Sequence, residues 1–209
     1  PLIWAQFIGG ISTGWSAYNP LAGQAPLGMN GYIMFICIFA LSTMVAGANI
    51  TTTVVRMRAK GMTWNRTPIL IYGIVASVAL ALPAFPVFFL SQVMSGMDRA
   101  LDTSFYNPAG GGSGWLYENL FWIMGHPEVY VILIPAVAAL MEMAPVFTRR
   151  PLFSFNVAVM GIAGISGLSV LVWAHHMYIS GWAPLLNAPF MLTTELISIP
   201  TGMLFLVLA

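Results

Sequence analysis

Long apolar stretches separated by short polar segments make up most of the chain. They lie near residues 1–17, 30–55, 68–96, 119–147, 153–180 and 189–209. A membrane-spanning helix needs about 20 consecutive apolar residues, so we predict about six spans, of which the first and last are incomplete. Gly and Pro residues interrupt these stretches, and neighbouring helices must then satisfy the freed backbone groups. The pattern predicts an all-α, polytopic transmembrane helix bundle.

The charges of the connecting segments predict the orientation of the chain. Residues 56–67 carry Arg56, Arg58, Lys60 and Arg66, and residues 148–152 carry two further arginines. Because positively charged loops tend to stay on the cytoplasmic side, we expect both segments there. The glycine-rich loop between the third and fourth spans carries acidic residues, and residues 181–188 carry no charge. These two segments are expected on the opposite side of the membrane.

The composition excludes several classes of protein. Hydrophobic residues make up 59% of the chain and charged residues 6%, whereas about a quarter of the residues in soluble domains are charged. The net charge of +1 is too small to indicate a nucleic-acid surface. The single cysteine, Cys37, has no partner for a disulfide, and we assign it to helix packing. Both ends of the chain lie in apolar stretches, so we expect residues 1–209 to be a single transmembrane domain and an internal fragment of a longer subunit.

The three histidines of the chain, His126, His175 and His176, all lie in apolar stretches. Counted inward from the same membrane surface, they reach a depth of about 6–11 Å. Three imidazoles suit copper, iron or zinc. Each histidine could instead pack between helices and bond to a carbonyl, but three at one depth favour a ligand set. Neighbouring residues diverge by about 100° around a helix, so convergence of His175 and His176 requires a local backbone adjustment or particular ring orientations.

Two further polar residues flank the first histidine. Tyr130 follows His126 by four positions and lies on the same helix face, where its phenol could give a proton and an electron to a metal-bound substrate. The alternative is a core tyrosine. Glu128 lies about 200° around the helix from His126 and should point away from the metal. A buried carboxyl without a partner is neutral most of the time and suits a proton relay.

The chain also contains sequence motifs that are characteristic of one family. They are Thr-Gly-Trp-Ser-Ala-Tyr-Asn-Pro-Leu-Ala-Gly at 13–23, Asn-Pro-Ala-Gly-Gly-Gly at 107–112, Gly-His-Pro-Glu-Val-Tyr at 125–130, Trp-Ala-His-His-Met at 173–177 and Ile-Pro-Thr-Gly at 199–202. Together they closely resemble subunit I of the heme-copper oxygen reductases, in the branch with a glutamate in the His-Pro-Glu-Val-Tyr motif, such as cytochrome c oxidase. The resemblance covers essentially the whole chain. It implies a segment from the middle of the twelve-helix fold of that subunit.

The resemblance implies roles for the residues around the histidines. His126, His175 and His176 match the three ligands of copper B. Tyr130 matches the tyrosine that is cross-linked to the first of these histidines and takes part in oxygen reduction. Glu128 matches the glutamate at the inner end of the D proton pathway.

The resemblance also implies heme contacts and proton-pathway positions. Trp15 resembles a residue that contacts the low-spin heme, and Thr194, Thr201 and Gly202 fall where the family lines the high-spin heme or the approach to the tyrosine. The axial heme ligands of the family lie outside this segment. The polar residues Asn49 and Ser42 match positions of the D pathway.

One departure from the family concerns the K proton pathway. Leu204 stands where a lysine usually feeds protons toward the tyrosine, and Met141 stands where a serine is frequent. We therefore hypothesise that protons reach the tyrosine by another polar set, involving Glu142, Ser198 or Glu195, or that the D pathway carries most of them.

The leading function is that of a proton-pumping terminal oxidase that reduces O2 to water at a heme-copper centre. The expected partners are oxidase subunits II and III, cytochrome c or quinol as electron donor, membrane lipid, O2 and protons, and no nucleic acid. The expected location is a bacterial or archaeal plasma membrane or the mitochondrial inner membrane. The alternatives are a nitric oxide reductase of the same superfamily, which normally lacks the tyrosine motif, and a transporter or non-catalytic packing subunit.

Overall fold

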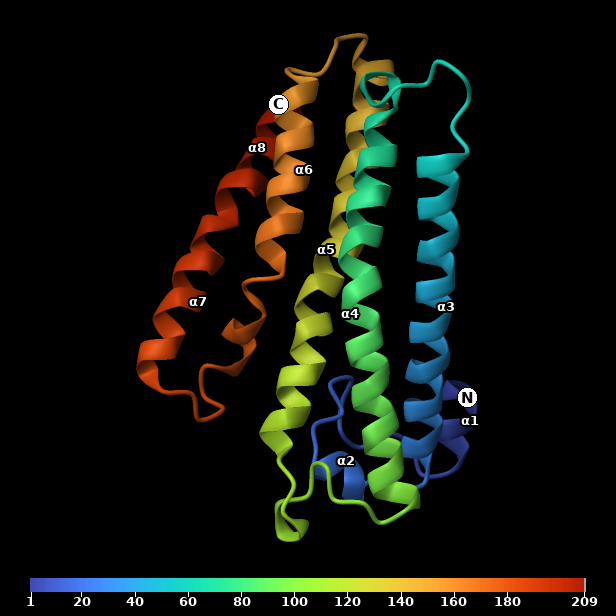
Figure 1. The fold of residues 1–209 in the computed structure, drawn as a ribbon, viewed down its shortest axis with the longest axis vertical. Coiled ribbons are helices and arrows are strands. Elements are labelled where there is room, and N and C mark those ends of the chain that lie inside the picture. Colours follow the sequence, from blue (N-terminus) through green and yellow to red (C-terminus); the bar gives the residue numbers. More distant parts are fainter. Residues whose placement is uncertain (209) are drawn as a thin grey trace. The chain divides into compact units, whose positions relative to one another are not determined.

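The computed structural model describes residues 1–208; Ala209, the last residue of the sixth expected span, lies outside them. The described chain is helical and contains no strand. Four helical segments are long and apolar enough to cross a membrane. They are α3 (Gly28–Arg56), α4 (Ile69–Ala100), α5 (Gly114–Thr148) and the consecutive pair α7 (Pro184–Leu196) and α8 (Ser198–Leu208) (Figure 1). The predicted all-α bundle of membrane-spanning helices is therefore confirmed.

Shorter helices connect or precede these segments. They are α1 (Leu2–Phe7), α2 (Leu21–Gln24), α6 (Phe155–Ser169) and the 3-10 helices η1 (Trp64–Arg66), η2 (Pro108–Gly110) and η3 (Trp173–Met177). Helix α6 is apolar but has only 15 residues. Two of the six expected spans are therefore shorter in the structure than the apolar pattern predicts.

The first expected span, near residues 1–17, is replaced by a short helix and a loop. Helix α1 ends at Phe7, and Gly9, Gly10 and Gly14 have φ angles of 106°, 69° and 65°. Glycine adopts this left-handed conformation without steric cost, and an α-helix cannot pass through it. The prediction of a span here was wrong because it used only the apolar composition of the segment and did not consider the backbone conformation of its glycines.

The fifth expected span, residues 153–180, ends early as an α-helix. Ser154 caps α6 by accepting a hydrogen bond from the Val157 N–H at 3.4 Å, and the helix ends at Ser169. Residues 173–177 then form η3, which carries two of the three histidines. The predicted span therefore divides into a short apolar helix and a separate segment that bears ligand candidates.

One compact unit of the chain comprises Pro1–Val45 and Ala84–Met124. Its interior contains Tyr106, Tyr117 and Phe121, all with no exposed area. Gln92 Nε2 donates to the Tyr117 hydroxyl at 2.9 Å, and that hydroxyl donates to the Ser16 carbonyl at 2.9 Å. Burial and the nearby carboxylate of Asp98 raise the pKa of Tyr106 in the loop after α4. The Tyr106 phenol therefore remains a neutral hydrogen-bonding group.

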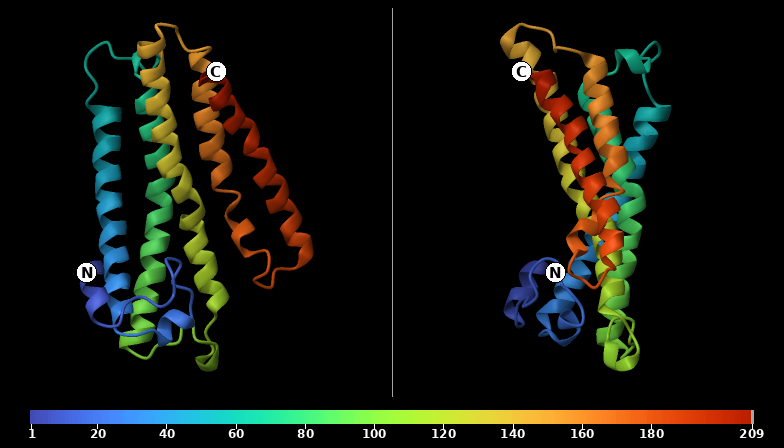
Figure 2. Two further views of the ribbon diagram at one scale, coloured as in Figure 1. Left: turned by 180° about the vertical axis from the view of Figure 1, so that it is seen from behind. Right: turned by 90° about the vertical axis from the view of Figure 1, so that its left-hand side faces the viewer.

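The second compact unit comprises Ala46–Pro83 and Gly125–Ala209 and contains all three histidines. Its apolar core joins residues of α4, α5, α6 and α8, including Ile134, Met141, Ile165 and Leu204. Helices α6 and α8 lie side by side (Figure 2). A Cβ atom added at Gly73 of α4 would lie 2.5 Å from the Ala138 Cβ atom of α5. Helix contact in this unit therefore depends on small residues, as is typical of membrane proteins.

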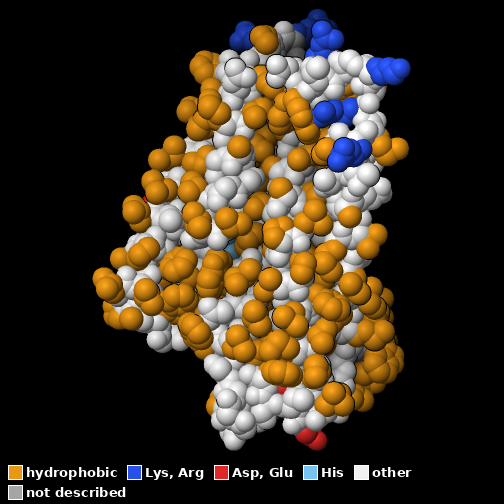
Figure 3. Space-filling model, viewed as in Figure 1, with side chains coloured by type: hydrophobic (Ala, Val, Ile, Leu, Met, Phe, Trp, Pro, Cys, Tyr) orange, Lys and Arg blue, Asp and Glu red, His pale blue; other side chains and the backbone are white. Residues whose placement is uncertain are grey.

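The basic residues of the second unit gather at one of its ends. Six of the seven Lys and Arg residues belong to this unit, at the last residue of α3, in the segment after α3 and in the segment between α5 and α6. Figure 3 shows this concentration of Lys and Arg side chains. The uncharged segment 181–188 lies at the opposite end of the unit (Figure 1). The basic and uncharged segments thus lie at opposite ends of the unit, and the side of the membrane that each faces stays a prediction.

Candidate metal centre

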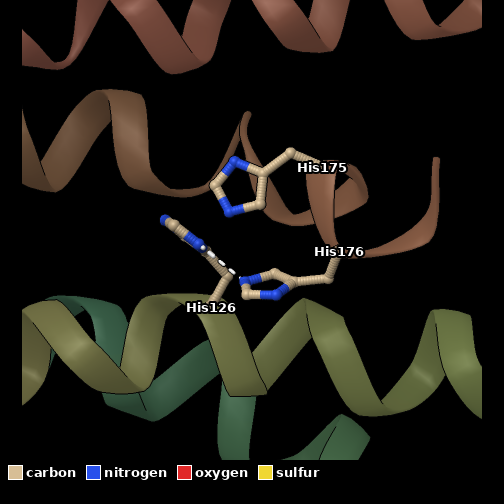
Figure 4. Close-up of side chains that lie close together, drawn as sticks. All are labelled: His126, His175 and His176. Atoms are coloured by element: carbon tan, nitrogen blue, oxygen red, sulfur yellow. Dashed lines mark hydrogen bonds between the residues drawn. The ribbon is translucent and has the colours of Figure 1, made fainter.

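The three histidines converge in the second unit. His126 lies on α5, and His175 and His176 lie on η3 (Figure 4). One ligand nitrogen from each ring lies within 4.8 Å of the other two. The ring centroids of His175 and His176 are 4.4 Å apart, and those of His126 and His175 are 4.5 Å apart. Side chains from segments about 50 residues apart in sequence are thus placed around one point.

The backbone around each histidine explains this placement. His126 precedes Pro127 inside α5, which continues as a helix through Pro127, Pro135 and Pro145. His175 and His176 occupy a 3-10 helix rather than a continuation of α6. Short 3-10 segments are common as connectors between helices. The 3-10 segment provides the local backbone adjustment that convergence of two neighbouring histidines requires.

The hydrogen bonds of His126 are incomplete. His126 is 4% exposed, and its Nδ1 atom lies 3.2 Å from His176 Nε2 (Figure 4). Its Nε2 atom is buried and has no hydrogen-bond partner among the described residues. A buried polar atom without a partner carries a desolvation cost of about 1–3 kcal/mol. Coordination by one or more of the imidazoles would reorganise these contacts, and the donor set fits a nitrogen-preferring transition metal such as copper.

Thr194 of α7 holds the ring of His175. The Thr194 hydroxyl lies 2.8 Å from His175 Nδ1 and 2.6 Å from the Phe190 carbonyl oxygen. Because the carbonyl can only accept, the hydroxyl donates to Phe190 and accepts from the His175 Nδ1–H group. His175 Nε2 is then left as the lone-pair nitrogen. Sequence reasoning placed Thr194 near a heme or the tyrosine and missed this contact, because no sequence spacing relates α7 to η3.

Tyr130 and Glu128 lie on different sides of α5. The ring centroid of Tyr130 is 5.1 Å from that of His126. Glu128 is half-buried, and it is not among the groups that form the histidine cluster. The structure therefore brings Tyr130 to His126, as a spacing of four residues on a helix predicts. That Glu128 points away from the metal stays a prediction.

The expected heme-contact residues differ in their surroundings. Trp15 belongs to the first unit, where its ring contacts Phe121 with centroids 5.1 Å apart. The Thr201 hydroxyl donates to the Ile197 carbonyl at 2.8 Å, and a Cβ atom added at Gly202 would meet nothing within 4 Å. Of this group, the structure places Thr194 directly against a histidine.

The residues considered for proton transfer also separate into two groups. Met141 has no exposed area, and Leu204 is 2% exposed in the same apolar core. Glu142, Glu195 and Ser198 are exposed. Glu142 accepts a hydrogen bond from the Leu70 N–H at 3.3 Å, at the start of α4. A negatively charged carboxylate near a helix N-terminus interacts favourably with the positive end of the helix dipole. Glu142 therefore has a structural role at the start of α4.

The D-pathway candidates lie on α3. Asn49 and Ser42 are both exposed, and they belong to different compact units. Their assignment to a proton pathway stays a prediction.

Comparison with known proteins identifies the family of the chain. Residues 2–209 match the family described as "Cytochrome C and Quinol oxidase polypeptide I". The chain is 40% identical over 200 residues to "Ubiquinol oxidase subunit 1" of Acetobacter aceti, covering 94% of this chain and 30% of that protein. It is 39% identical over 198 residues to "Cytochrome c oxidase subunit 1" of Bacillus subtilis (strain 168), covering 94% of this chain and 32% of that protein.

The chain thus spans about a third of the length of these curated relatives. Oxidase subunits of this kind are integral membrane proteins, in agreement with the four apolar helical segments. The match over nearly all residues and the motifs around the three histidines lead to one conclusion: the chain belongs to the cytochrome c and quinol oxidase polypeptide I family, subunit I of the heme-copper oxidases.

Proposed function

We propose that this chain is part of the catalytic subunit of a terminal respiratory oxidase that reduces O2 to water and pumps protons. The observation that carries the proposal is the convergence of His126, His175 and His176 within 4.8 Å, in a chain of this family. The incomplete hydrogen bonding of His126 supports a metal at this point. The three histidines are proposed as the ligands of copper B.

The proposed cofactors supply chemistry that the side chains lack. Copper, together with a high-spin heme, would bind O2 and transfer electrons to it. The three imidazoles fix the position of the metal, and Thr194 sets the tautomer of His175 by accepting its Nδ1–H. Tyr130 is the proposed donor of a proton from its hydroxyl and of an electron, because its ring lies 5.1 Å from the His126 ring. Its cross-link to His126 stays a prediction.

Glu128 is the proposed last carboxyl of a proton relay. It is half-buried on α5, two residues after His126 and on another side of the helix. A carboxyl in this position can take a proton from one side and release it on the other as its side chain turns. Glu128 therefore acts on proton delivery in this proposal, while the histidines hold the metal.

The remaining heme contacts and partners follow from the family. Trp15 is proposed to contact the low-spin heme, and Thr194, Thr201 and Gly202 are proposed to line the high-spin heme or the approach to Tyr130. The axial heme ligands are proposed to lie outside this segment. Subunits II and III are the proposed protein partners. The relatives are named for ubiquinol and for cytochrome c, so the proposal includes both electron donors.

Metal analysis of the intact oxidase tests the copper assignment. We expect His175→Asn to lose the copper held by this subunit while both hemes keep their optical bands. Tyr178→Phe is the matched control, because Tyr178 follows η3 closely and its side-chain hydroxyl has no hydrogen bond among residues 1–208; its carbonyl accepts from Asn187 Nδ2 at 3.4 Å. Full copper content in His175→Asn would contradict the assignment.

Gas consumption distinguishes oxygen reduction from nitric oxide reduction. The intact oxidase should consume O2 when supplied with reduced cytochrome c or with quinol. It should consume nitric oxide far more slowly than O2. Tyr130→Phe should abolish most O2 reduction, because it removes the hydroxyl proton. Faster consumption of nitric oxide than of O2 would favour the reductase alternative.

A further inference from the structure

The turn of residues 14–18 belongs to the first compact unit and lies between α1 and α2. Gly14 has a φ angle of 65°, and Ala17 has a φ angle of 48°. This left-handed conformation is ordinary for glycine but unfavourable for alanine, and it persists only where the surroundings fix the backbone. Ala17 is 1% exposed. The groups packed around the turn therefore hold it in a strained conformation.

Two phenols from different helices bind successive carbonyls of this turn. The Tyr32 hydroxyl of α3 donates to the Trp15 carbonyl. The Tyr117 hydroxyl of α5 donates to the Ser16 carbonyl at 2.9 Å. Gln92 Nε2 of α4 donates to the Tyr117 hydroxyl at 2.9 Å, so the single proton of that phenol remains available for the turn. Side chains of three helices thus fix two successive peptide groups.

The side chain of Trp15 is partly packed and partly exposed. Its ring centroid lies 5.1 Å from that of Phe121 and 5.7 Å from that of Trp122, both on α5. Phe121 has no exposed area, whereas Trp15 is 56% exposed. A flat ring that is supported by other aromatic rings and keeps a free surface suits contact with a planar group such as a porphyrin. The backbone of the turn determines where this free surface lies.

We propose that Tyr32 and Tyr117 are positioning residues that hold the turn so that the exposed surface of Trp15 meets a heme. The proposal rests on the heme contact of Trp15 in the proposed function. Tyr117 has no exposed area, so it acts through the turn and not by touching the heme. Loss of either hydroxyl leaves a carbonyl without its donor and lets the strained backbone at Ala17 relax. The Trp15 ring then moves away from its place against the heme.

Optical spectra and amide hydrogen exchange of the intact, heme-loaded oxidase test the proposal together. Trp15→Phe first identifies the heme band that responds to this contact. Tyr117→Phe and Tyr32→Phe should shift the same band. In both variants the amides of residues 14–18 should exchange about fivefold faster, the factor expected for one lost hydrogen bond. Gln92→Met should cause smaller changes, because the Tyr117 hydroxyl keeps its acceptor in the turn.

Tyr106→Phe is the matched control. Tyr106 is likewise a phenol with no exposed area in the same unit, but its hydroxyl donates to the Ser91 carbonyl of α4 at 3.1 Å. This variant should leave the heme band and the exchange of residues 14–18 unchanged.

Two kinds of failure can be told apart. If Trp15→Phe shifts no heme band, the heme contact of the proposed function is wrong, and the positioning role is overturned with it. If Trp15→Phe shifts a band and Tyr117→Phe does not, the positioning role alone is overturned, even where exchange of the turn becomes faster. Equal effects of Tyr106→Phe and Tyr117→Phe would also overturn it, because they would show a general effect of losing a buried hydroxyl.

Discussion

Thr194 is the residue that links α7 to the candidate metal centre. Its hydroxyl accepts from His175 Nδ1–H at 2.8 Å and donates to the Phe190 carbonyl at 2.6 Å. Thr194→Val keeps the side-chain shape but leaves that N–H without its acceptor. Loss of a hydrogen bond to a metal-ligating histidine typically lowers metal affinity about 10–100-fold. We therefore expect the Thr194→Val oxidase to lose its copper at a chelator concentration about 10–100-fold lower than the unsubstituted oxidase requires.

The neighbouring residue provides a control for this variant. The Thr193 hydroxyl contacts the carbonyls of Leu171, Pro189 and Phe190, and none of its hydrogen bonds reaches a histidine. Thr193→Val should therefore keep its copper, and Thr194→Ser should recover the copper retention of the unsubstituted oxidase. Equal copper loss from Thr193→Val and Thr194→Val would show that the effect is structural.

Glu128 and Glu142 are two carboxyls of α5 with different surroundings. Glu128 is half-buried, whereas Glu142 is exposed and receives the Leu70 N–H. We expect Glu128→Gln to slow O2 consumption by about 100-fold, the range of a lost proton-transfer group. Glu142→Gln should leave turnover and pumping within about twofold, because a neutral amide oxygen still accepts from Leu70.

The effects of Glu128→Gln and Glu142→Gln are measured on vesicles that contain the intact oxidase. Proton uptake and O2 consumption are recorded together. A strong loss in Glu142→Gln would instead support the hypothesis that this carboxyl replaces the lysine of the K pathway. The same measurement on Glu195→Gln completes the test of that substitute route.

At the residue scale, sequence reasoning found the histidines and Tyr130 but not their supporting contacts. A spacing of four residues on one helix predicts that His126 and Tyr130 share a face, and their ring centroids are 5.1 Å apart. The contact of His175 with Thr194 joins two segments through tertiary packing. No periodicity in the sequence encodes such a contact, so it could be found only from the structure.

At the scale of the elements, apolar length predicted the long helices and failed where the backbone breaks. Helices α3, α4 and α5 agree with the expected spans to within a few residues. The segment after α1 does not form the expected span, because the positive φ angles of Gly9, Gly10 and Gly14 end the helix within an apolar region. Hydropathy indicates whether a segment lies in lipid or in water. It does not show whether the backbone stays helical, which here depends on the conformation of the glycines.

The approach of α4 to α5 within the second unit is set by Gly73. An added Cβ atom would lie 2.5 Å from the Ala138 Cβ atom and 3.2 Å from the Ile134 carbonyl oxygen. Gly73→Ala should therefore force the two helices apart and destabilise the intact oxidase by about 1–3 kcal/mol. The measurement is the midpoint of denaturant-induced loss of the helical circular dichroism signal.

Two comparisons isolate the steric effect. Ala138→Gly combined with Gly73→Ala should restore much of the lost stability, because it removes the opposing methyl group. Gly167→Ala on α6 should be neutral or stabilising, because a Cβ atom there meets nothing within 4 Å and alanine favours the helix. Equal destabilisation by Gly167→Ala and Gly73→Ala would argue against helix contact as the cause.

At the scale of the whole molecule, the structure gives two compact units, Pro1–Val45 with Ala84–Met124 and Ala46–Pro83 with Gly125–Ala209. The expectation of a single transmembrane domain stays a prediction. Within the second unit, however, charge and topology agree. The segments with six Lys and Arg residues lie at one end and the uncharged segment 181–188 lies at the other. The membrane orientation of this unit can therefore be tested at its two ends.

Single cysteines at two alanines make that test. Ala59 and Ala183 are both exposed, one in the basic segment and one in the uncharged segment. In a Cys37→Ala background, a membrane-impermeant maleimide should label Ala59→Cys in inverted vesicles and Ala183→Cys in right-side-out vesicles. The physical reason is that positively charged loops are retained on the cytoplasmic side. Labelling after detergent lysis gives the total amount of reactive cysteine at each position. Because both substitutions start from the same residue, the reverse pattern would contradict the orientation itself and with it the cytoplasmic assignment of the basic segments.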